Sequence, residues 1–323
     1  MKALITGITG MDASHLAEFL LEKGYEVFGL IRRSSTDNTW RIRGILDKIT
    51  LIPGDMTDST SLIKAVEISM PDEVYNLAAQ SYVKESWNSP ESTFDINAIG
   101  LVRLLNAVKL IKKDAKVYQA STSEMFGRSP APQNELTPFY PRSMYGVSKL
   151  AAYWTAVNYR ESYGMFISNG ISFNHESHRR GLEFLSRKVA YNVAKIKLGK
   201  SDKLVLGNLD ARRDWGWAPE YVEAFWKMLQ LEYPVDLVLS TGVSHSVKEF
   251  VIEAFESVGL DWGKYVLYSR DLTRPTEVDR LEGDSTIARE TIGWYPKVDF
   301  KELVWTMVNA DLLRLARGDK IEP

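Results

Sequence analysis

The stretch Ala3-Leu4-Ile5-Thr6-Gly7-Ile8-Thr9-Gly10-Met11-Asp12-Ala13 decides which fold we expect. Its first four residues form the short apolar run typical of a strand buried on both faces, and an amphipathic helical pattern follows the second glycine. In this context Gly7 permits a tight turn, Gly10 lets the backbone approach a pyrophosphate, and the helix N-terminus supplies N–H groups and a positive dipole end. The stretch predicts the first unit of a dinucleotide-binding α/β fold, although the glycines alone would also suit a structural turn.

The second expected strand, residues 26–31, ends in Arg32-Arg33-Ser34-Ser35. In dinucleotide-binding folds the end of this strand meets the adenosine ribose. An acidic residue there hydrogen-bonds a free 2′-hydroxyl, whereas arginine accommodates a 2′-phosphate. Two arginines followed by two hydroxyls favour NADP over NAD, and we rank this interpretation above a solvated basic turn.

Further strands are expected along the chain, at residues 49–53, 73–77, 116–120 and 166–171, and a long helix is expected at residues 92–112. Asp55-Met56 lies where an adenine edge would be, and the small residues of Ala78-Ala79-Gln80-Ser81 would let a cofactor backbone lie close. We expect an α/β protein: a Rossmann-type doubly wound parallel sheet in residues 1–174, and a smaller mixed α/β substrate domain in residues 175–323 with some segments crossing back.

Composition excludes several classes of function. The net charge of −2 argues against binding a nucleic-acid backbone, and the absence of cysteine excludes disulfides, thiolate metal sites and thiol nucleophiles. The four histidines lack a metal-ligand spacing, so we expect no metal. No apolar run reaches membrane-spanning length and the N-terminus does not resemble a signal peptide, so a cytoplasmic enzyme or binding protein is expected.

A tyrosine and a lysine lie one helical turn apart in Tyr145-Gly146-Val147-Ser148-Lys149, within an expected helix of residues 143–159. A free tyrosine has a pKa of about 10, and a nearby ammonium favours the phenolate and lowers that pKa. Tyr145 with Lys149 could therefore act as a general base for an alcohol. Taken alone, the motif more often marks a surface tyrosine over a solvated lysine.

Hydroxyl and carboxyl groups follow the expected strand at residues 116–120, in Ser121-Thr122-Ser123-Glu124. Ligands of an open parallel sheet bind outside the carboxyl ends of its strands, so Thr122 and Glu124 are well placed for chemistry. The common alternative for such a cluster is a helix cap or a turn.

The second half of the chain carries dense polar loops. One loop contains Asn174 and His175, and an expected helix at residues 184–198 carries Lys188. Basic residues recur at other loop positions, which would suit a phosphorylated or nucleotide-linked substrate. Single loop arginines are more often solvated.

Taken in order, these segments resemble the extended short-chain dehydrogenase/reductases, and more closely the GDP-mannose 4,6-dehydratase family, over nearly the whole chain. The Tyr145–Lys149 motif is shared by the whole superfamily, and Glu124 is characteristic of its sugar 4,6-dehydratases. The stretches Asn174-His175-Glu176 and Arg213-Asp214-Trp215-Gly216 resemble the GDP-mannose branch. The chain departs from the family pattern at Ala13, Met144 and His178, and the loop between Glu124 and Tyr145 is about one residue short.

The resemblance implies roles for individual residues. The implied catalytic residues are Thr122, Glu124, Tyr145 and Lys149. The implied NADP-binding residues are Gly7, Ile8, Thr9, Gly10, Met11, Asp12, Arg32, Arg33, Ser34, Ser35, Asp55, Met56, Leu77, Ala78, Ala79, Gln80, Ser81, Tyr145, Lys149, His175 and Arg180. The implied GDP-mannose-binding residues are Ser81, Asn174, Lys188, Arg213, Arg274 and Glu277. Residues 33–41 match a family loop that reaches a neighbouring subunit, which implies a homotetramer built as a dimer of dimers.

The implied reaction converts GDP-D-mannose into GDP-4-keto-6-deoxy-D-mannose and water. Tyr145 takes the proton of the C4 hydroxyl, hydride passes from C4 to NADP, and the 4-keto group acidifies the C5 hydrogen. Glu124 removes that hydrogen and protonates the departing C6 hydroxyl, and the hydride returns to C6. Thr122 is expected to hydrogen-bond the C4 oxygen, and Lys149 to hold the nicotinamide ribose and depress the pKa of Tyr145.

Two alternatives stay open at this point. A nucleotide-sugar epimerase or 4-keto reductase would share the fold but has no need of a carboxylate at Glu124. A catalytically silent NADP-binding sensor would have no need of the full set Thr122, Glu124, Tyr145 and Lys149. Both features favour the dehydratase.

Overall fold

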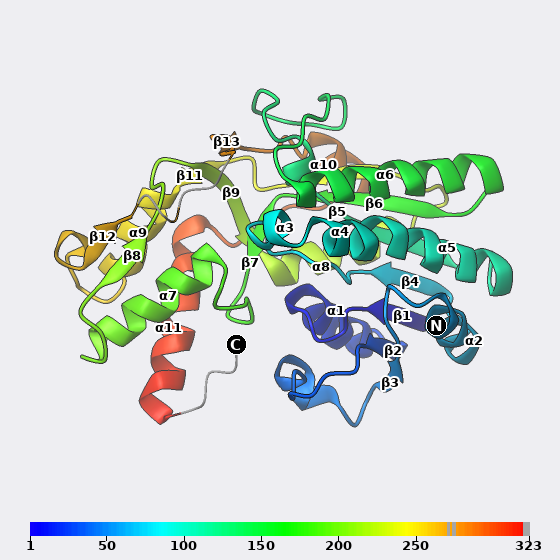
Figure 1. Cartoon of the computed structure of the whole chain (residues 1–323), viewed down its shortest axis with the longest axis horizontal. Coiled ribbons are helices and arrows are strands. Elements are labelled where there is room, and N and C mark those ends of the chain that lie inside the picture. The colour runs from blue at the N-terminus through cyan, green and yellow to red at the C-terminus, as the bar shows by residue number, and fades with distance from the viewer. Residues whose placement is uncertain (270–271, 273–275, 319–323) are drawn as a thin grey trace.

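A seven-stranded parallel sheet forms the centre of the molecule (Figure 1). The computed structural model describes residues 1–269, 272 and 276–318. The strand order is β10-β6-β5-β4-β1-β2-β3, so the chain order reverses on either side of β1. The strands are β1 (Lys2–Thr6), β2 (Glu26–Ile31), β3 (Thr50–Pro53), β4 (Glu73–Asn76), β5 (Lys116–Thr122), β6 (Ile167–Ser172) and β10 (Asp236–Leu239). Open sheets bind ligands at such a reversal, outside the carboxyl ends of the strands, which here are those of β1 and β4.

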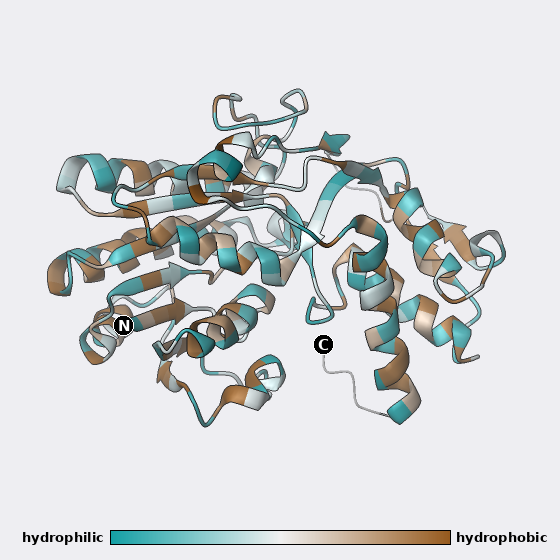
Figure 2. Cartoon of the chain, turned by 180° about the vertical axis from the view of Figure 1, so that it is seen from behind, coloured by the Kyte–Doolittle hydropathy of each residue, from teal (hydrophilic) through white to brown (hydrophobic). Residues whose placement is uncertain are grey.

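Helices cover both faces of the sheet because alternate strand residues are apolar on opposite sides. Ala3 and Ile5 of β1 belong to the core under α1 and α8, whereas Leu4 belongs to the core under α2, α5 and α6. In Figure 2 hydrophobic and hydrophilic stretches alternate along these helices. Their bounds are α1 (Met11–Glu22), α2 (Ser59–Ser69), α5 (Gly100–Ile111), α6 (Met144–Tyr163) and α8 (Ala218–Leu229).

A smaller lobe lies beside the carboxyl ends of the sheet (Figure 1). A four-stranded sheet has β9 at its centre, paired with β7, β11 and β13, and a two-stranded sheet joins β8 to β12. The strands are β7 (Asn174–Glu176), β8 (Leu204–Leu206), β9 (Arg212–Trp217), β11 (Ser244–Ser246), β12 (Val266–Tyr268) and β13 (Arg280–Leu281). Helices α7 (Leu185–Lys197), α9 (Val247–Glu256) and α11 (Phe300–Arg317) enclose a separate apolar core. The chain returns to the main sheet at α8, β10 and α10 (Thr286–Ile292).

The long helix expected at residues 92–112 is confirmed, and it contains a π-helical turn that was not predicted. Helix α4 (Pro90–Phe94) runs into a π-helical turn, η2 (Asp95–Ile99), before α5 begins. Asn97 in this turn accepts a hydrogen bond from the Gln80 N–H (2.9 Å) and donates to the Gln80 carbonyl (3.1 Å) and the Ser148 hydroxyl (3.0 Å). The π turn thus ties the segment after β4 to α6.

The remaining short elements are α3 (Glu85–Asn88), η1 (Trp40–Ile45), η3 (Ser123–Met125) and η4 (Trp262–Lys264). Strand β5 is longer than expected and includes Thr122, because Thr122 pairs with Ser172 of β6. Among the helices of the described residues, none has the length and apolarity needed to cross a membrane.

Candidate active site

The turn between β1 and α1 is pressed against the end of β4. Gly7 has a φ of 69°, and a Cβ there would lie 2.8 Å from the Ala78 Cα, so only glycine fits. The Thr6 hydroxyl accepts hydrogen bonds from the N–H groups of Leu77 and Ala78, both at 3.1 Å. These contacts bring Leu77 and Ala78 beside Thr6 and Gly7.

The second lobe reaches the N-terminus of α1 through His175. Its Nε2 lies 3.0 Å from the Asp12 carboxylate, its Nδ1 lies 2.7 Å from the Phe173 carbonyl, and its ring stacks on Tyr221. Burial opposes the charged imidazolium, but the Asp12 carboxylate outweighs it and raises the pKa of His175. Arg180 donates to the Glu176 carboxylate (2.6 Å) and to the His175 carbonyl. His175 and Arg180 therefore converge on the same edge as the glycine turn.

The basic turn after β2 is open to solvent. Arg32, Arg33, Ser34 and Ser35 are all exposed, and neither guanidinium has an ion-pair partner among the residues that the structure describes. After β3, the Asp55 carboxylate accepts hydrogen bonds from the N–H and hydroxyl of Thr57 (2.9 and 2.8 Å), and Met56 is buried. The guanidinium groups of Arg32 and Arg33 therefore present positive charge to solvent at the end of β2, where they can contact an anion.

The four predicted catalytic residues meet where β5 ends and α6 begins. Thr122 accepts a hydrogen bond from the Glu124 N–H (3.3 Å) at the start of η3. Helix α6 starts at Met144 behind a Ser143 cap and carries Tyr145 and Lys149 on one face. Lys149 donates to the Ala120 carbonyl of β5 at 2.9 Å. Tyr145, Lys149 and Glu124 are all buried.

Gly146 permits this close approach, and the sequence analysis missed its role. A Cβ on Gly146 would lie 2.7 Å from the Glu124 carbonyl oxygen and 3.0 Å from the Pro141 Cβ. The first turn of α6 therefore lies directly on the backbone that carries Glu124. The signal was present as a helix-disfavouring glycine between Tyr145 and Lys149.

The pKa values correct one expectation. Burial raises the pKa of Tyr145 to about 12, with the nearby Thr122 side chain opposing the shift and the Glu124 carboxylate adding to it. Burial also lowers the pKa of Lys149 to about 8. The net shift of the Tyr145 pKa is therefore upward, opposite to the direction expected from Lys149, because desolvation by burial is its largest cause.

The predicted substrate residues lie mostly on the second lobe. Asn174 on β7 pairs with Trp215 of β9, and the neighbouring Arg213 is buried and donates to the Val278 carbonyl at 2.8 Å. Lys188 of α7 donates to the Val205 carbonyl at 2.8 Å, and burial lowers its pKa.

The other three substrate predictions have different outcomes. Ser81 is exposed after β4, and Glu277 lines a cavity of about 330 Å³ together with Arg128 and Arg142. Arg274 lies outside the described residues. The cavity adjoins the loop that follows Glu124, and the sequence analysis did not single out its two arginines.

The departures from the family pattern fit into regular structure. Ala13 is buried in α1, and Met144 is the first residue of α6. The His178 carbonyl accepts hydrogen bonds from Arg187 (2.7 Å) and Arg314 (2.8 Å). None of the three displaces a predicted catalytic side chain.

Comparison with known proteins gives matches over the whole fold. A family model described as GDP-mannose 4,6 dehydratase matches residues 4–307. The chain is 52% identical over 331 residues to GDP-mannose 4,6 dehydratase 1 of Arabidopsis thaliana, covering 99% of this chain and 91% of that protein. It is 51% identical over 338 residues to GDP-mannose 4,6 dehydratase of Homo sapiens, covering 96% and 91%. The structure of Thermus thermophilus UDP-glucose 4-epimerase in complex with NAD superposes with a TM-score of 0.84 at 25% identity, covering 96% of this chain and 99% of that one.

Proposed function

Because the chain belongs to the GDP-mannose 4,6-dehydratase family, we propose that Thr122, Glu124, Tyr145 and Lys149 carry out the family's reaction. The protein is a hydro-lyase that converts GDP-D-mannose into GDP-4-keto-6-deoxy-D-mannose and water. The observation that carries the assignment of residues is the contact of Gly146 with the Glu124 carbonyl, which brings the backbone of the buried Glu124 against the helical turn that bears Tyr145.

The cofactor that best fits these residues is NADP. The related Thermus epimerase is bound to NAD, so a nicotinamide dinucleotide suits the fold. The glycine turn leaves room for a pyrophosphate at the start of α1, and the exposed Arg32 and Arg33 would hold a 2′-phosphate. His175 and Arg180 would close over the same edge. When bound, oxidised nicotinamide accepts a hydride from the sugar C4 and later returns it to C6.

Tyr145 would receive the proton of the sugar C4 hydroxyl. Because its pKa is raised to about 12, its phenol is protonated at neutral pH, and action as a base requires added positive charge beside it. Lys149 is protonated below its pKa of about 8 and lies one turn along α6. The hydroxyl of Thr122, whose side chain influences the pKa of the Tyr145 phenol, would hydrogen-bond the C4 oxygen.

Glu124 would act at C5 and C6 of the sugar. Once C4 is a ketone, the C5 hydrogen is acidic enough for a carboxylate to remove. The same group, now a carboxylic acid, would protonate the C6 hydroxyl as it leaves as water. An epimerase or reductase has no step that needs this group, which is why the buried Glu124 favours dehydration.

The second lobe would bind the GDP part of the substrate. Asn174, Lys188, Arg213, Arg274 and Glu277 are the proposed contacts, with Ser81 near the sugar. On this proposal residues 1–174 bind the cofactor and residues 175–323 bind the substrate, although β10 returns to the main sheet. We also propose a homotetramer in which residues 33–41 reach a neighbouring subunit, and sedimentation velocity of the purified protein tests it: a monomer would contradict it.

The function is tested by incubating the purified protein with GDP-mannose and no added reductant, followed by mass spectrometry. We expect a product lighter by the mass of one water. An isomer of unchanged mass would indicate an epimerase, and tight NADP binding with no product would indicate a sensor.

A further inference from the structure

The motif Arg213-Asp214-Trp215-Gly216 contains two buried charged residues, Arg213 and Asp214. The proposed function assigns Arg213 to the substrate but gives Asp214 no role. It lies in β9, the strand at the centre of the four-stranded sheet, and its side chain has no exposure to solvent. A buried carboxylate is strongly destabilising unless hydrogen bonds satisfy it. The partners that satisfy Asp214 therefore indicate what it holds in place.

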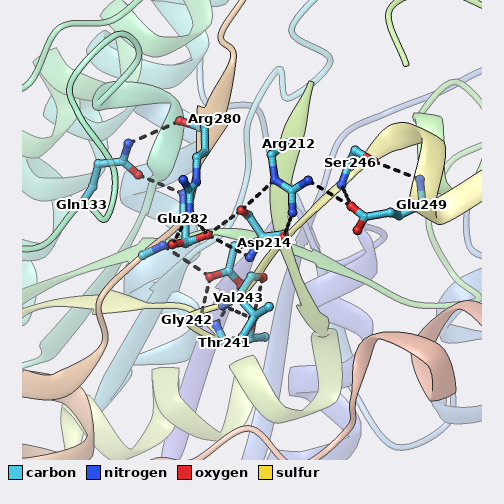
Figure 3. A network of polar contacts seen from close by, with 12 residues as sticks. Gln133, Arg212, Asp214, Thr241, Gly242, Val243, Ser246, Glu249, Arg280 and Glu282 are labelled. Carbon is cyan, nitrogen blue, oxygen red and sulfur yellow. Dashed lines mark hydrogen bonds and ion pairs between the residues drawn. The ribbon is translucent and has the colours of Figure 1, made fainter. Parts of the chain in front are cut away.

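The Asp214 carboxylate accepts hydrogen bonds on both oxygens (Figure 3). Its Oδ1 accepts from the N–H (2.9 Å) and the hydroxyl (2.6 Å) of Thr241, and its Oδ2 accepts from the N–H groups of Gly242 (2.9 Å) and Gly283 (3.3 Å). Gly242 has a φ of 87°, a conformation that suits glycine and belongs to the turn between β10 and β11. All these partners are donors, so the ionised carboxylate is the form that fits.

The donors belong to two segments that meet at the main sheet. Thr241 and Gly242 follow β10, the edge strand of that sheet, and Gly283 follows β13. A Cβ on Gly283 would lie 2.5 Å from the Ser240 Cβ and 2.7 Å from a ring carbon of Phe173, so β13 leaves the small sheet pressed against the large one. The hydrogen bonds of Asp214 thus hold β9 at the junction of the two lobes.

The hydrogen bonds of Asp214 also affect the positions of two proposed substrate-binding residues, Arg213 and Glu277. Arg213 donates to the Val278 carbonyl (2.8 Å), and the Arg212 N–H donates to the Asp279 carbonyl (2.7 Å). Glu277 directly precedes this segment, which then continues into β13 and Gly283. The distance from Arg213 to Glu277 therefore depends on how firmly β13 is held against β9.

A second set of contacts surrounds this arrangement on its more open side (Figure 3). Glu282 accepts hydrogen bonds from Ser244 and Arg280, and its own N–H donates to the Gln133 side chain (3.1 Å). Arg212 pairs with Glu249 at 3.2 Å, where both side chains are substantially exposed. Exposed pairs contribute little, so the buried Asp214 is the stronger constraint.

We propose that Asp214 is a positioning residue for the nucleotide-sugar site: its carboxylate holds β13 and the turn between β10 and β11 so that Arg213 and Glu277 bind the GDP part of the substrate. The inference rests on the proposed function, which assigns those two residues to GDP-mannose. It makes Asp214 a determinant of substrate affinity and gives it no contact with the reacting atoms.

The test measures GDP binding by calorimetry and steady-state kinetics with GDP-mannose in Asp214→Asn. An amide of the same shape presents an NH₂ group to donors, so the constraint is lost. We expect the Kd for GDP and the KM for GDP-mannose to rise by about tenfold to a hundredfold, with kcat and the Kd for NADP within about twofold of the parent protein. Glu249→Gln, in the exposed part of the network, is the matched control and should leave all four values unchanged.

Thr241→Val and Thr241→Ser form a second pair that does not alter the buried charge. The valine removes the hydroxyl donor to Asp214, and the serine retains it. We expect about a threefold to tenfold rise in the Kd for GDP with valine and none with serine. If Asp214→Asn does not fold, equal affinities in this pair overturn the proposal.

These outcomes distinguish failure of the proposed substrate class from failure of the positioning role of Asp214. A parent protein that binds neither GDP nor GDP-mannose contradicts the proposed substrate class. A parent protein that binds GDP, with an Asp214→Asn variant that binds it equally well, overturns only the positioning role. An Asp214→Asn variant that loses kcat while keeping its KM also overturns it.

Discussion

The catalytic edge and the substrate lobe are held together in different ways. At the catalytic edge, defined by Thr122, Glu124, Tyr145 and Lys149, the contacts join the end of β5 to the start of α6, and each side chain belongs to a short motif. The hydrogen bond from Lys149 to Ala120 spans 29 residues of sequence, whereas in the substrate lobe the hydrogen bonds from Arg213 to Val278 and from Gly283 to Asp214 span 65 and 69 residues. The comparison teaches that the reactive groups can be found from local sequence, whereas the geometry that binds the substrate depends on distant segments.

The largest effect should come from Glu124→Gln, which breaks the catalytic edge alone. The amide retains the shape of the side chain but cannot remove a proton, so we expect kcat to fall by about a hundredfold to ten-thousandfold. The Kd for GDP, which depends on the substrate lobe, should not change. Dehydration is followed by mass spectrometry and GDP binding by calorimetry, and near-normal turnover would remove Glu124 from its role.

A smaller effect is expected from the double variant Arg32→Ala/Arg33→Ala, because neither residue belongs to the catalytic edge or to the substrate lobe. Loss of two cations beside a 2′-phosphate should weaken NADP binding by about tenfold to a hundredfold and leave NAD binding unchanged. Titration of intrinsic fluorescence with each dinucleotide measures both affinities. An equal loss for NAD and NADP would contradict recognition of the 2′-phosphate.

Gly146→Ala tests how closely the two halves of the catalytic edge are packed. The new methyl would meet the Glu124 carbonyl at 2.7 Å. We expect a loss of about 1–3 kcal/mol in the free energy of unfolding and about a tenfold fall in kcat. Gly44→Ala is the matched control, because nothing lies within 4 Å of the added Cβ. Urea denaturation and steady-state assays compare the two, and equal stability and activity would show that the contact is not needed.

The mildest test changes only pH. Burial lowers the pKa of Lys149 to about 8, so its ammonium is present below that pH and is lost above it. If the charge is required, kcat/KM for GDP-mannose should be level between about pH 7 and 8 and fall about tenfold per unit above that. The Kd for GDP should stay constant over the same range, since the substrate lobe does not include Lys149. A level profile to about pH 10 would contradict the role of the ammonium.

The sequence predicted the parallel sheet because its signals are local. The apolar run before Gly7, the glycine turn and the amphipathic helix placed the cofactor edge, and the strand expected at residues 26–31 was confirmed as β2. The π turn η2 was not predicted, because it is stabilised by Asn97 contacts with Gln80 and Ser148, which are distant in sequence.

The chemistry of the site was predicted less completely than its residues. Spacing placed Tyr145 and Lys149 on one face of α6, but the direction of the Tyr145 pKa shift depends on burial by the whole fold, and it was wrong. The role of Asp214 gave no local signal, since the N–H and hydroxyl of Thr241 and the backbone N–H groups of Gly242 and Gly283 that bind it lie 27 to 69 residues away in the sequence. Backbone donors leave no trace in a side-chain pattern.

The most direct measurement uses GDP-mannose that carries deuterium at C4 of the mannose, incubated with the purified protein and catalytic NADP. The account predicts that the 4-keto-6-deoxy product keeps the deuterium, now at C6, as seen by NMR. Loss of the label to solvent, or a requirement for added reduced cofactor in stoichiometric amount, would contradict an internal redox dehydration at Thr122, Glu124, Tyr145 and Lys149.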